Sequence, residues 1–470
     1  MKTEHGEWNV QGYYDRIVSI DDAVMRTYAA LANMDAAEAP SAPLFNLYSV
    51  SLLHALECIE QCSQHLGDIP SDEITYSSMW NETNSRKDGT IKDDVHFPQR
   101  DESIIYSSPF VGVGNPLLQS ARRRYTGNSD YDLVDLTAIP ADYELRVKYA
   151  RACSDAEYAK RMPKMADGTP FDAIYRVVCR RMVRIENERT LQSAGVHPRV
   201  AWVNTVTGYG VHPQRCATLA LMMGAQASIP LDFQIRSIGK MDIHPGTLRL
   251  LPIPEGVLER EIICRALLLN CLTSAYADLW RSCWNGSYTM MQWSKQNPRL
   301  PNVTFSNLTD TWTYETPLRT EYSRRQALVE LDVLVAMALG MTLDELVDIY
   351  RFTFPVLKSY EDDTWYDQTG RVVFSAKKAY NKISLTRDEF DKIRDEQNGF
   401  VKTITVSDDT LPEGPITREI SFMAPYDRCD RVEDYRVAWA FFEKKYGEAL
   451  AMERAEREDQ RTAAQKEDEQ

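Results

Sequence analysis

Two long segments in the second half of the chain are rich in apolar residues at helical spacing. The first runs from Leu258 to Trp284 and is apolar on every side, and the second covers Glu321 to Leu339. A helix that is apolar all round has no side for solvent, so it must lie in a protein core or a membrane. No apolar run reaches the roughly 18 residues of a membrane span. The sequence therefore predicts two long helices, of which the first is buried in a protein core.

The chain is large enough to enclose such helices. It has 470 residues, of which 43% are hydrophobic, so we expect one substantial core and room for two or three. The start from Met1 to Trp8 is polar and lacks the apolar core of a secretory signal, and we therefore expect a cytoplasmic protein. The nine cysteines are odd in number and scattered, and they are expected to be reduced thiols.

Apolar spacing and chain breakers predict the other elements. Helices are predicted at Asp21 to Asn33, Leu44 to Leu66, Asp172 to Glu186 and Arg215 to Ala227, with a charged helix from Val437 onward. Short strands are predicted at Ile104 to Tyr106, Arg199 to Asn204, Arg371 to Ser375 and Val401 to Val406. The polar stretch Asn81 to Gly89 is predicted to be a loop.

Two local signals mark the end of the second long helix. Gly340 follows Leu339 and tolerates the left-handed conformation that closes many helices. Thr342 and Glu345 then have the spacing of a capping box, which predicts a new helix from there to about Arg351.

Positive charge gathers in one window of an otherwise acidic chain. The net charge is −15, yet ten basic and four acidic residues lie between Arg176 and Leu250, which leaves +6 there. Within this window, Ser228 to Pro252 is punctuated by glycine and predicted to be strand-like. Such a stretch is typical of a nucleic-acid-reading surface, because arginine can read guanine and glutamine can pair with adenine, while arginine, lysine or histidine can contact phosphates. The candidate DNA-binding residues are Gln234, Arg236, Lys240, His244 and Arg249.

The same segment resembles the target-recognition region of large adenine-N6 DNA methyltransferases of the combined restriction-modification type. A small residue, an apolar pair, Asp232, the aromatic Phe233, then Arg236, a glycine-containing turn and a closing Leu-Pro follow in that order. The stretch Glu330 to Val356 is similar to the segment that follows the recognition domain in that family.

Two later segments extend the resemblance. Thr364 to Phe374 and Asp408 to Pro415 are similar to the C-terminal ends of large bacterial members tied to restriction and anti-phage defence, including those of DISARM type. The resemblance therefore covers roughly Tyr106 to Tyr446.

The elements and the resemblance together predict a mixed α/β (α+β) fold, in which a target-recognition-type domain is flanked by helical regions and a small β-containing region. The expected parts are a helical region at 1–100, a target-recognition-like α/β domain at 101–257, a helical domain at 258–356, a small mixed β region at 357–446 and a charged helical or disordered tail at 447–470.

A complete methyltransferase site is not expected in this chain. Amino methyltransferases hold a flipped base with an Asn or Asp, two prolines and an aromatic ring. The nearest match has Asn115 and Pro116, but Leu117 and Leu118 stand where the second proline and the ring belong. This degenerate motif is therefore interpreted as a tight turn capped by Asn115, and we expect no catalytic residues and no catalysis by the chain alone.

Cofactor and metal signals are weak as well. The glycines between Val111 and Gly114 lack the acidic residue that would complete an adenosylmethionine site, so this cofactor is expected only through a partner or a missing domain. Cys58 and Cys62 lack a second Cys or His pair, so no metal is expected. Asp232 has no evident partner lysine and is interpreted as structural.

Three hypotheses follow. In the first, the chain is the DNA-specificity component of a restriction-modification or defence system, binds double-stranded DNA and delivers a methyltransferase or helicase subunit, with no membrane partner. In the second, it is a scaffold or interaction subunit that does not bind DNA, in keeping with its charge of −15. In the third, it is the C-terminal piece of a larger adenine methyltransferase.

Overall fold

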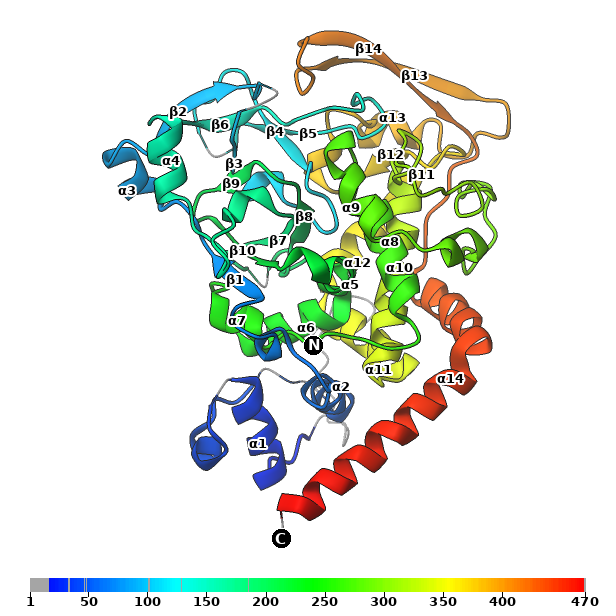
Figure 1. The fold of residues 1–470 in the computed structure, drawn as a ribbon. Coiled ribbons are helices and arrows are strands. Elements are labelled where there is room, and N and C mark those ends of the chain that lie inside the picture. Colours follow the sequence, from blue (N-terminus) through cyan, green and yellow to red (C-terminus); the bar gives the residue numbers. More distant parts are fainter. Residues whose placement is uncertain are drawn as a thin grey trace.

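A computed structural model describes residues 17–468 except 33, 46, 48, 100–101, 128 and 185. About 41% of the chain is helix and 17% is strand, which confirms the predicted mixed α/β class. The start Met1 to Trp8 and the last two residues of the predicted tail lie outside the described residues. Figure 1 shows the strands gathered in the upper part of the molecule and the helices below and beside them.

Two four-stranded sheets form the β part. The first is antiparallel and has the strands β1 (Ile74–Ser77), β10 (Val206–Val211), β7 (Arg176–Arg180) and β8 (Ser193–Val196) in that order. The second has β2 (Ile91–His96), β6 (Val147–Arg151), β3 (Ile104–Tyr106) and β9 (Val200–Trp202), and only its last pair is parallel. The strands predicted around Ile104 and Val200 are thus confirmed. A short ribbon joins β4 (Gln119–Ala121) to β5 (Tyr131–Leu133).

Two predictions in this part are wrong. The predicted helix from Asp172 to Glu186 is wrong, since this segment contains strand β7, whose Val177 and Val178 pack into two different cores on the two faces of its sheet. The predicted loop from Asn81 to Gly89 contains helix α3 (Glu82–Lys87), whose first turn is capped by the side chain of Asn81. Helix α4 (Asp155–Arg161) lies beside the second sheet at the left of Figure 1, and its Tyr158 shares a small core with Ile105 of β3.

Three buried helices form the centre, and all three lie in segments that the sequence predicts to be helical. They are α5 (Cys216–Ala227), α8 (Glu259–Asn270) and α10 (Glu321–Ala338). The first long helix is shorter than predicted, since α8 ends at Asn270 and a separate α9 (Ala277–Ser282) follows. The buried side chain of Asn270 donates to the carbonyl of Ala266 and accepts from the backbone of Gly195, so the chain is held to the sheet where the helix stops.

Both local signals after α10 are confirmed. Gly340 has a φ of +87° directly after the helix, and Thr342 and Glu345 form a reciprocal capping box at the start of α11 (Leu343–Asp348). A single π-helical turn, Ile349–Thr353, then leads into α12 (Pro355–Glu361).

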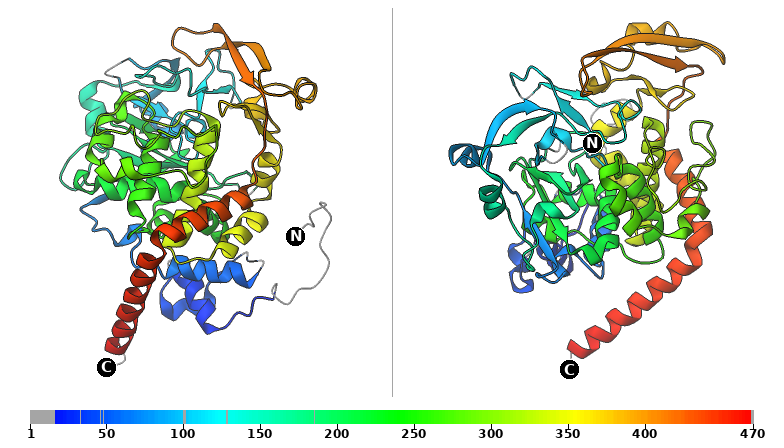
Figure 2. Two further views of the ribbon diagram at one scale, coloured as in Figure 1. Left: turned by 90° about the vertical axis from the view of Figure 1, so that its right-hand side faces the viewer. Right: turned by 45° about the horizontal axis from the view of Figure 1, so that its top comes forward.

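The periphery consists of the two ends of the chain. The helices α1 (Asp22–Leu31) and α2 (Val50–Glu60) lie at the bottom of the view in Figure 1. The C-terminal part contains the pair β11 (Thr364–Tyr366) and β12 (Val372–Ser375), the helix α13 (Arg387–Asp391) and the hairpin of β13 (Val401–Asp408) and β14 (Ile416–Met423). Finally, α14 (Arg431–Asp468) runs along the body and extends past it (Figure 2).

The largest hydrophobic core connects the first sheet, the central helices and the helices near both ends of the chain. It contains Leu56 of α2, Met222 of α5, Leu267 of α8, Leu334 of α10 and Phe442 of α14, and it thereby draws on the first four of the predicted regions and, through Leu450, on the fifth. Among the described residues no single helix is long and apolar enough to cross a membrane. Two consecutive helical stretches, Pro213–Ala227 and Ile229–Ile238, are long and apolar enough only when taken together, and the chain bends by 70° between them.

Candidate nucleic-acid surface and polar cluster

The segment from Ser228 to Pro252 is helical, so the predicted strand-like geometry is wrong. It forms α6 (Ile229–Ile238) and, after a short loop, α7 (Pro245–Arg249). Pro230 lies in the first turn of α6, and Gly239 closes it with a φ of +69°. Every residue from Ile229 to Ser237 is buried. A helix enclosed on all sides need not show the polar stripe of a surface helix, which is why its pattern resembles that of a strand.

Two of the five candidate DNA-binding residues lie inside the protein. The guanidinium of Arg236 donates to Thr190 Oγ1 over 2.8 Å and to the carbonyls of Asn187 and Thr353. Gln234 is fully buried, and its Nε2 donates to the carbonyl of Leu250 over 2.8 Å. Both side chains thus hold the segment against its neighbours, and neither is directed at solvent.

The other three candidates, Lys240, His244 and Arg249, are exposed. Lys240 and His244 flank the loop between α6 and α7, and Arg249 ends α7. The guanidinium of Arg249 lies 4.8 Å from the ring centre of Tyr76, within the range of a cation–π contact.

The loop between α6 and α7 is fixed to the end of β7. Val183 donates its backbone N–H to the carbonyl of Met241 over 2.9 Å, and Ile243 donates to the carbonyl of Arg181 over 2.8 Å. Met182 and Met241 are 60% and 80% exposed beside these bonds. We call Met182, Arg184, Lys240, Met241, His244 and Arg249 the α6–α7 surface; all six side chains are exposed.

Much of the positive window is structural. Arg176 is fully buried and donates to the carbonyls of Ile174, Val200 and His197, while Arg180 donates to the carbonyl of Val111. Arg176 and Arg180 both lie on strand β7 and not on the helix predicted from Asp172 to Glu186. Burial lowers the pKa of both Arg176 and Arg180 to about 10, which still leaves them cationic at neutral pH.

The degenerate methyltransferase motif is a turn, as interpreted from the sequence. The side-chain oxygen of Asn115 accepts from the backbone of Leu117 over 2.9 Å, and Gly112 donates to the carbonyl of Asn115 over 2.8 Å. Pro116 and Leu117 are buried in the core of the β part, and Arg324 of α10 donates to the carbonyl of Gly114. The motif therefore joins the sheets to the central helices.

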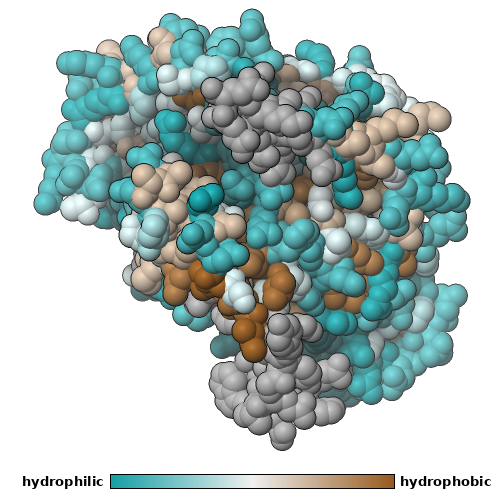
Figure 3. Space-filling view, turned by 90° about the horizontal axis from the view of Figure 1, so that it is seen from below, coloured by the Kyte–Doolittle hydropathy of each residue, from teal (hydrophilic) through white to brown (hydrophobic). Residues whose placement is uncertain are grey.

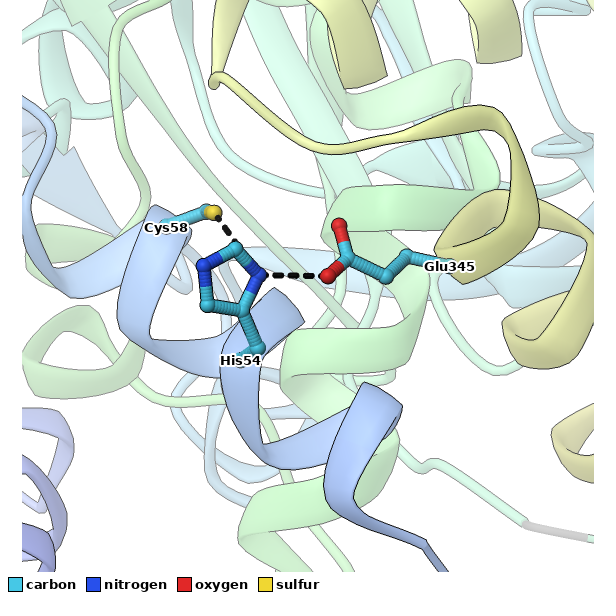
Figure 4. Close-up of side chains that lie close together, drawn as sticks. All are labelled: His54, Cys58 and Glu345. Carbon is cyan, nitrogen blue, oxygen red and sulfur yellow. Dashed lines mark hydrogen bonds and ion pairs between the residues drawn. The ribbon is translucent and has the colours of Figure 1, made fainter.

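A polar cluster that the sequence did not reveal lies between α2 and α11. Figure 4 shows His54 and Cys58, one turn apart on α2, facing Glu345 at the start of α11. His54 Nδ1 contacts Glu345 Oε1 and lies 3.8 Å from Cys58 Sγ. Burial, followed by the charges of Glu345 and Glu57, raises the pKa of Cys58 to about 12. Only the i, i+4 spacing of His54 and Cys58 was visible in the sequence, since Glu345 is hundreds of residues away.

No protein-family model matches this sequence, and no curated protein is significantly similar to it. The resemblance to adenine methyltransferases therefore stays a prediction that rests on the segments quoted from the sequence.

Proposed function

We propose that this chain is the DNA target-recognition component of a restriction-modification or anti-phage defence system of the adenine-N6 methyltransferase type. It acts in the cytoplasm on double-stranded DNA and delivers a methyltransferase or helicase subunit, which supplies the adenosylmethionine site. The observation that carries the proposal is the α6–α7 surface. There the basic side chains of Arg184, Lys240, His244 and Arg249 are exposed beside helix α6, which is itself buried and held by hydrogen bonds.

The buried helix α6 is suited to holding those exposed side chains in fixed positions. Arg236 joins α6 to the segments before and after it, and backbone hydrogen bonds fix the loop at Met241 and Ile243. A recognition site has to hold its contacting groups within about half an ångström, and rigid elements do this better than free loops. The buried half of the segment thus positions the exposed half.

The exposed charges fit a phosphate-contacting role. Lysine and arginine that neutralise phosphates release counterions, so their contribution falls steeply with salt. The whole-protein charge of −15 opposes this locally favourable field. Binding is therefore expected to be strongest at low salt and to depend on few contacts.

The test is duplex binding measured by fluorescence anisotropy over a series of salt concentrations. The Lys240→Ala/Arg249→Ala double variant should bind more weakly, and the slope of log affinity against log salt should fall by about 1.8, since each lost phosphate contact contributes about 0.9. The matched control is Lys160→Ala/Lys164→Ala, which removes two exposed lysines near α4 and should leave the slope unchanged. An unaltered slope in the α6–α7 double variant would refute the proposal.

A second candidate function, a scaffold subunit, is favoured by the exposed methionines. Met182 and Met241 project from the α6–α7 surface, and flexible methionines are common at protein-binding surfaces. The face seen from below also gathers hydrophobic residues near its centre (Figure 3). This function predicts no duplex binding even at low salt, together with loss of a co-purifying subunit in Met182→Glu/Met241→Glu. Under both functions, the isolated chain should transfer no methyl group from labelled adenosylmethionine.

A further inference from the structure

We propose that His54, Cys58 and Glu345 form a Zn²⁺ site that joins α2 to α11. The inference does not depend on the proposed function. It rests on three side chains of different chemistry whose ligand atoms all lie within 4.8 Å of one another. Two of them come from one face of α2 and the third from the first turn of α11 (Figure 4).

The distances approach those of a tetrahedral zinc centre. With Zn–S near 2.3 Å and Zn–N near 2.05 Å, tetrahedral ligands place sulfur and nitrogen about 3.6 Å apart. Cys58 Sγ and His54 Nδ1 are 3.8 Å apart. The contact between His54 Nδ1 and Glu345 Oε1 is closer than the separation of about 3.3 Å that two zinc ligands need. The imidazole can make this small movement, because the His54 side chain is 54% exposed.

The ligand types select zinc among the common divalent ions. Thiolate and imidazole bind Zn²⁺ well, whereas Mg²⁺ and Ca²⁺ prefer oxygen ligands alone. On binding, the Cys58 thiol gives its proton to solvent and the neutral imidazole donates the lone pair of Nδ1. The thiolate and the carboxylate then balance the two charges of the ion. Water would take the fourth position on the exposed side of His54.

The carboxylate is already oriented for this role. Glu345 Oε2 accepts from the backbone N–H of Thr342 over 2.7 Å, and this cap leaves Oε1 directed at His54. Outer-shell hydrogen bonds of this kind fix the orientation of metal ligands. Next to the cluster, Ser51 Oγ of α2 donates to Asp348 Oδ2 of α11 over 2.7 Å, so the same two helices are also held together by a direct hydrogen bond. A bound ion would fasten the N-terminal helices to the body of the protein.

The experiment uses the full chain, stripped of metal with a chelator and titrated with Zn²⁺ or Co²⁺. We expect one ion per chain, a thiolate-to-cobalt charge-transfer band with Co²⁺, and a rise in the unfolding temperature with Zn²⁺. Cys58→Ser should lose the band, because it removes the sulfur that gives rise to it. Both Cys58→Ser and His54→Ala should weaken Zn²⁺ binding by about 10–100-fold or more, the range for outer-shell changes, since each removes a direct ligand.

The matched control is Cys62→Ser, which changes the next thiol along the chain. Cys62 Sγ lies 3.5 Å from the carbonyl of Ile253, away from the cluster, so this variant should keep the band and the stoichiometry. Glu345→Gln retains an amide oxygen for the cap at Thr342 and should weaken zinc binding with the fold intact. The proposal is overturned if the intact chain binds no zinc at micromolar concentration, or if Cys58→Ser gives the same cobalt spectrum.

Discussion

Arg189 and Asp232 form an ion pair that is closed off from solvent. Arg189 Nε lies 2.6 Å from Asp232 Oδ2, and the two side chains are 5% and 0% exposed. The carboxylate also accepts the backbone N–H groups of Thr190 and Leu191, and the guanidinium donates to the carbonyls of Ala227 and Ser228. The pair therefore fixes the start of α6 to the segment between β7 and β8.

Replacing Asp232 with Ala should destabilise the protein strongly. The change leaves the Arg189 charge buried without a counter-charge, and breaking a buried pair from one side costs about 3–5 kcal/mol. Urea unfolding followed by circular dichroism measures the free energy. The control is Asp242→Ala, which removes a half-exposed partner of Arg181 at 3.2 Å and should cost at most about 1 kcal/mol. Equal losses in the two variants would contradict this account.

The fold was predictable where its signals are local. The capping box at Thr342, the left-handed Gly340 and the long helix α10 depend on residues within a few positions of one another, and all three are confirmed. Asp232 was interpreted as structural because no lysine partner was evident. Its role is structural, but the partner is Arg189, which the structure alone identifies.

Features that depend on distant residues were not predictable. Arg176 and Arg180 have the spacing of a helix face, yet their side chains find backbone carbonyls across the sheet and the segment is a strand. Arg236 looked like a surface reader because the carbonyls that bind it, at Asn187 and Thr353, are far away in the sequence. The same distance concealed the contact of Glu345 with His54.

Gly224 is expected to be essential for the close approach of α5 and α8. A Cβ atom at this position would lie 2.7 Å from Ile262 Cγ2 and 3.1 Å from Ala266 Cβ. Gly224→Ala should therefore destabilise the protein by roughly 1–3 kcal/mol, although alanine favours the helix itself. Gly246→Ala in α7 is the control, because its Cβ would meet no atom within 4 Å and helix propensity alone should apply. Thermal unfolding of both variants measures the two effects. A Gly224→Ala variant that is more stable than the wild type would contradict the prediction.

Glu321, at the start of α10, is expected to make stability depend on pH. Burial, together with the charge of Asp135, raises its pKa to about 7, and its Oε2 has no hydrogen-bond partner within the described part of the chain. Between the ordinary carboxyl pKa of 4.5 and pH 7, the unfolded chain is ionised while the folded chain keeps the proton. The folded state then binds more protons, so its stability falls as the pH rises through this window.

Glu321→Gln should remove this loss of stability at higher pH, because an amide does not ionise. Near pH 4 the Glu321 carboxyl is largely protonated in both the folded and the unfolded chain, so the variant should be as stable as the wild type. At pH 8 its free energy of unfolding should exceed that of the wild type by roughly 1–3 kcal/mol. Chemical unfolding at the two pH values measures the difference. A gain of equal size at pH 4 would show that the effect comes from shape and not from ionisation.

Cys216 and Cys283 lie close together, and Cys216 is expected to be the more reactive thiol of the two. Its Sγ lies 3.6 Å from the carbonyl of Ser282, and Cys283 Sγ lies 3.4 Å from the carbonyl of Cys216. A hydrogen bond from the Cys283 thiol, aided by backbone N–H groups at the start of α5, lowers the pKa of Cys216 to about 6. Because the thiolate is the nucleophile, iodoacetamide labelling, measured by peptide mass spectrometry, should rise near pH 6 and level off by pH 7. Cys283→Ala removes the donor and should move the rise towards the ordinary thiol pKa, whereas a wild-type rate that still climbs above pH 8 would contradict the prediction.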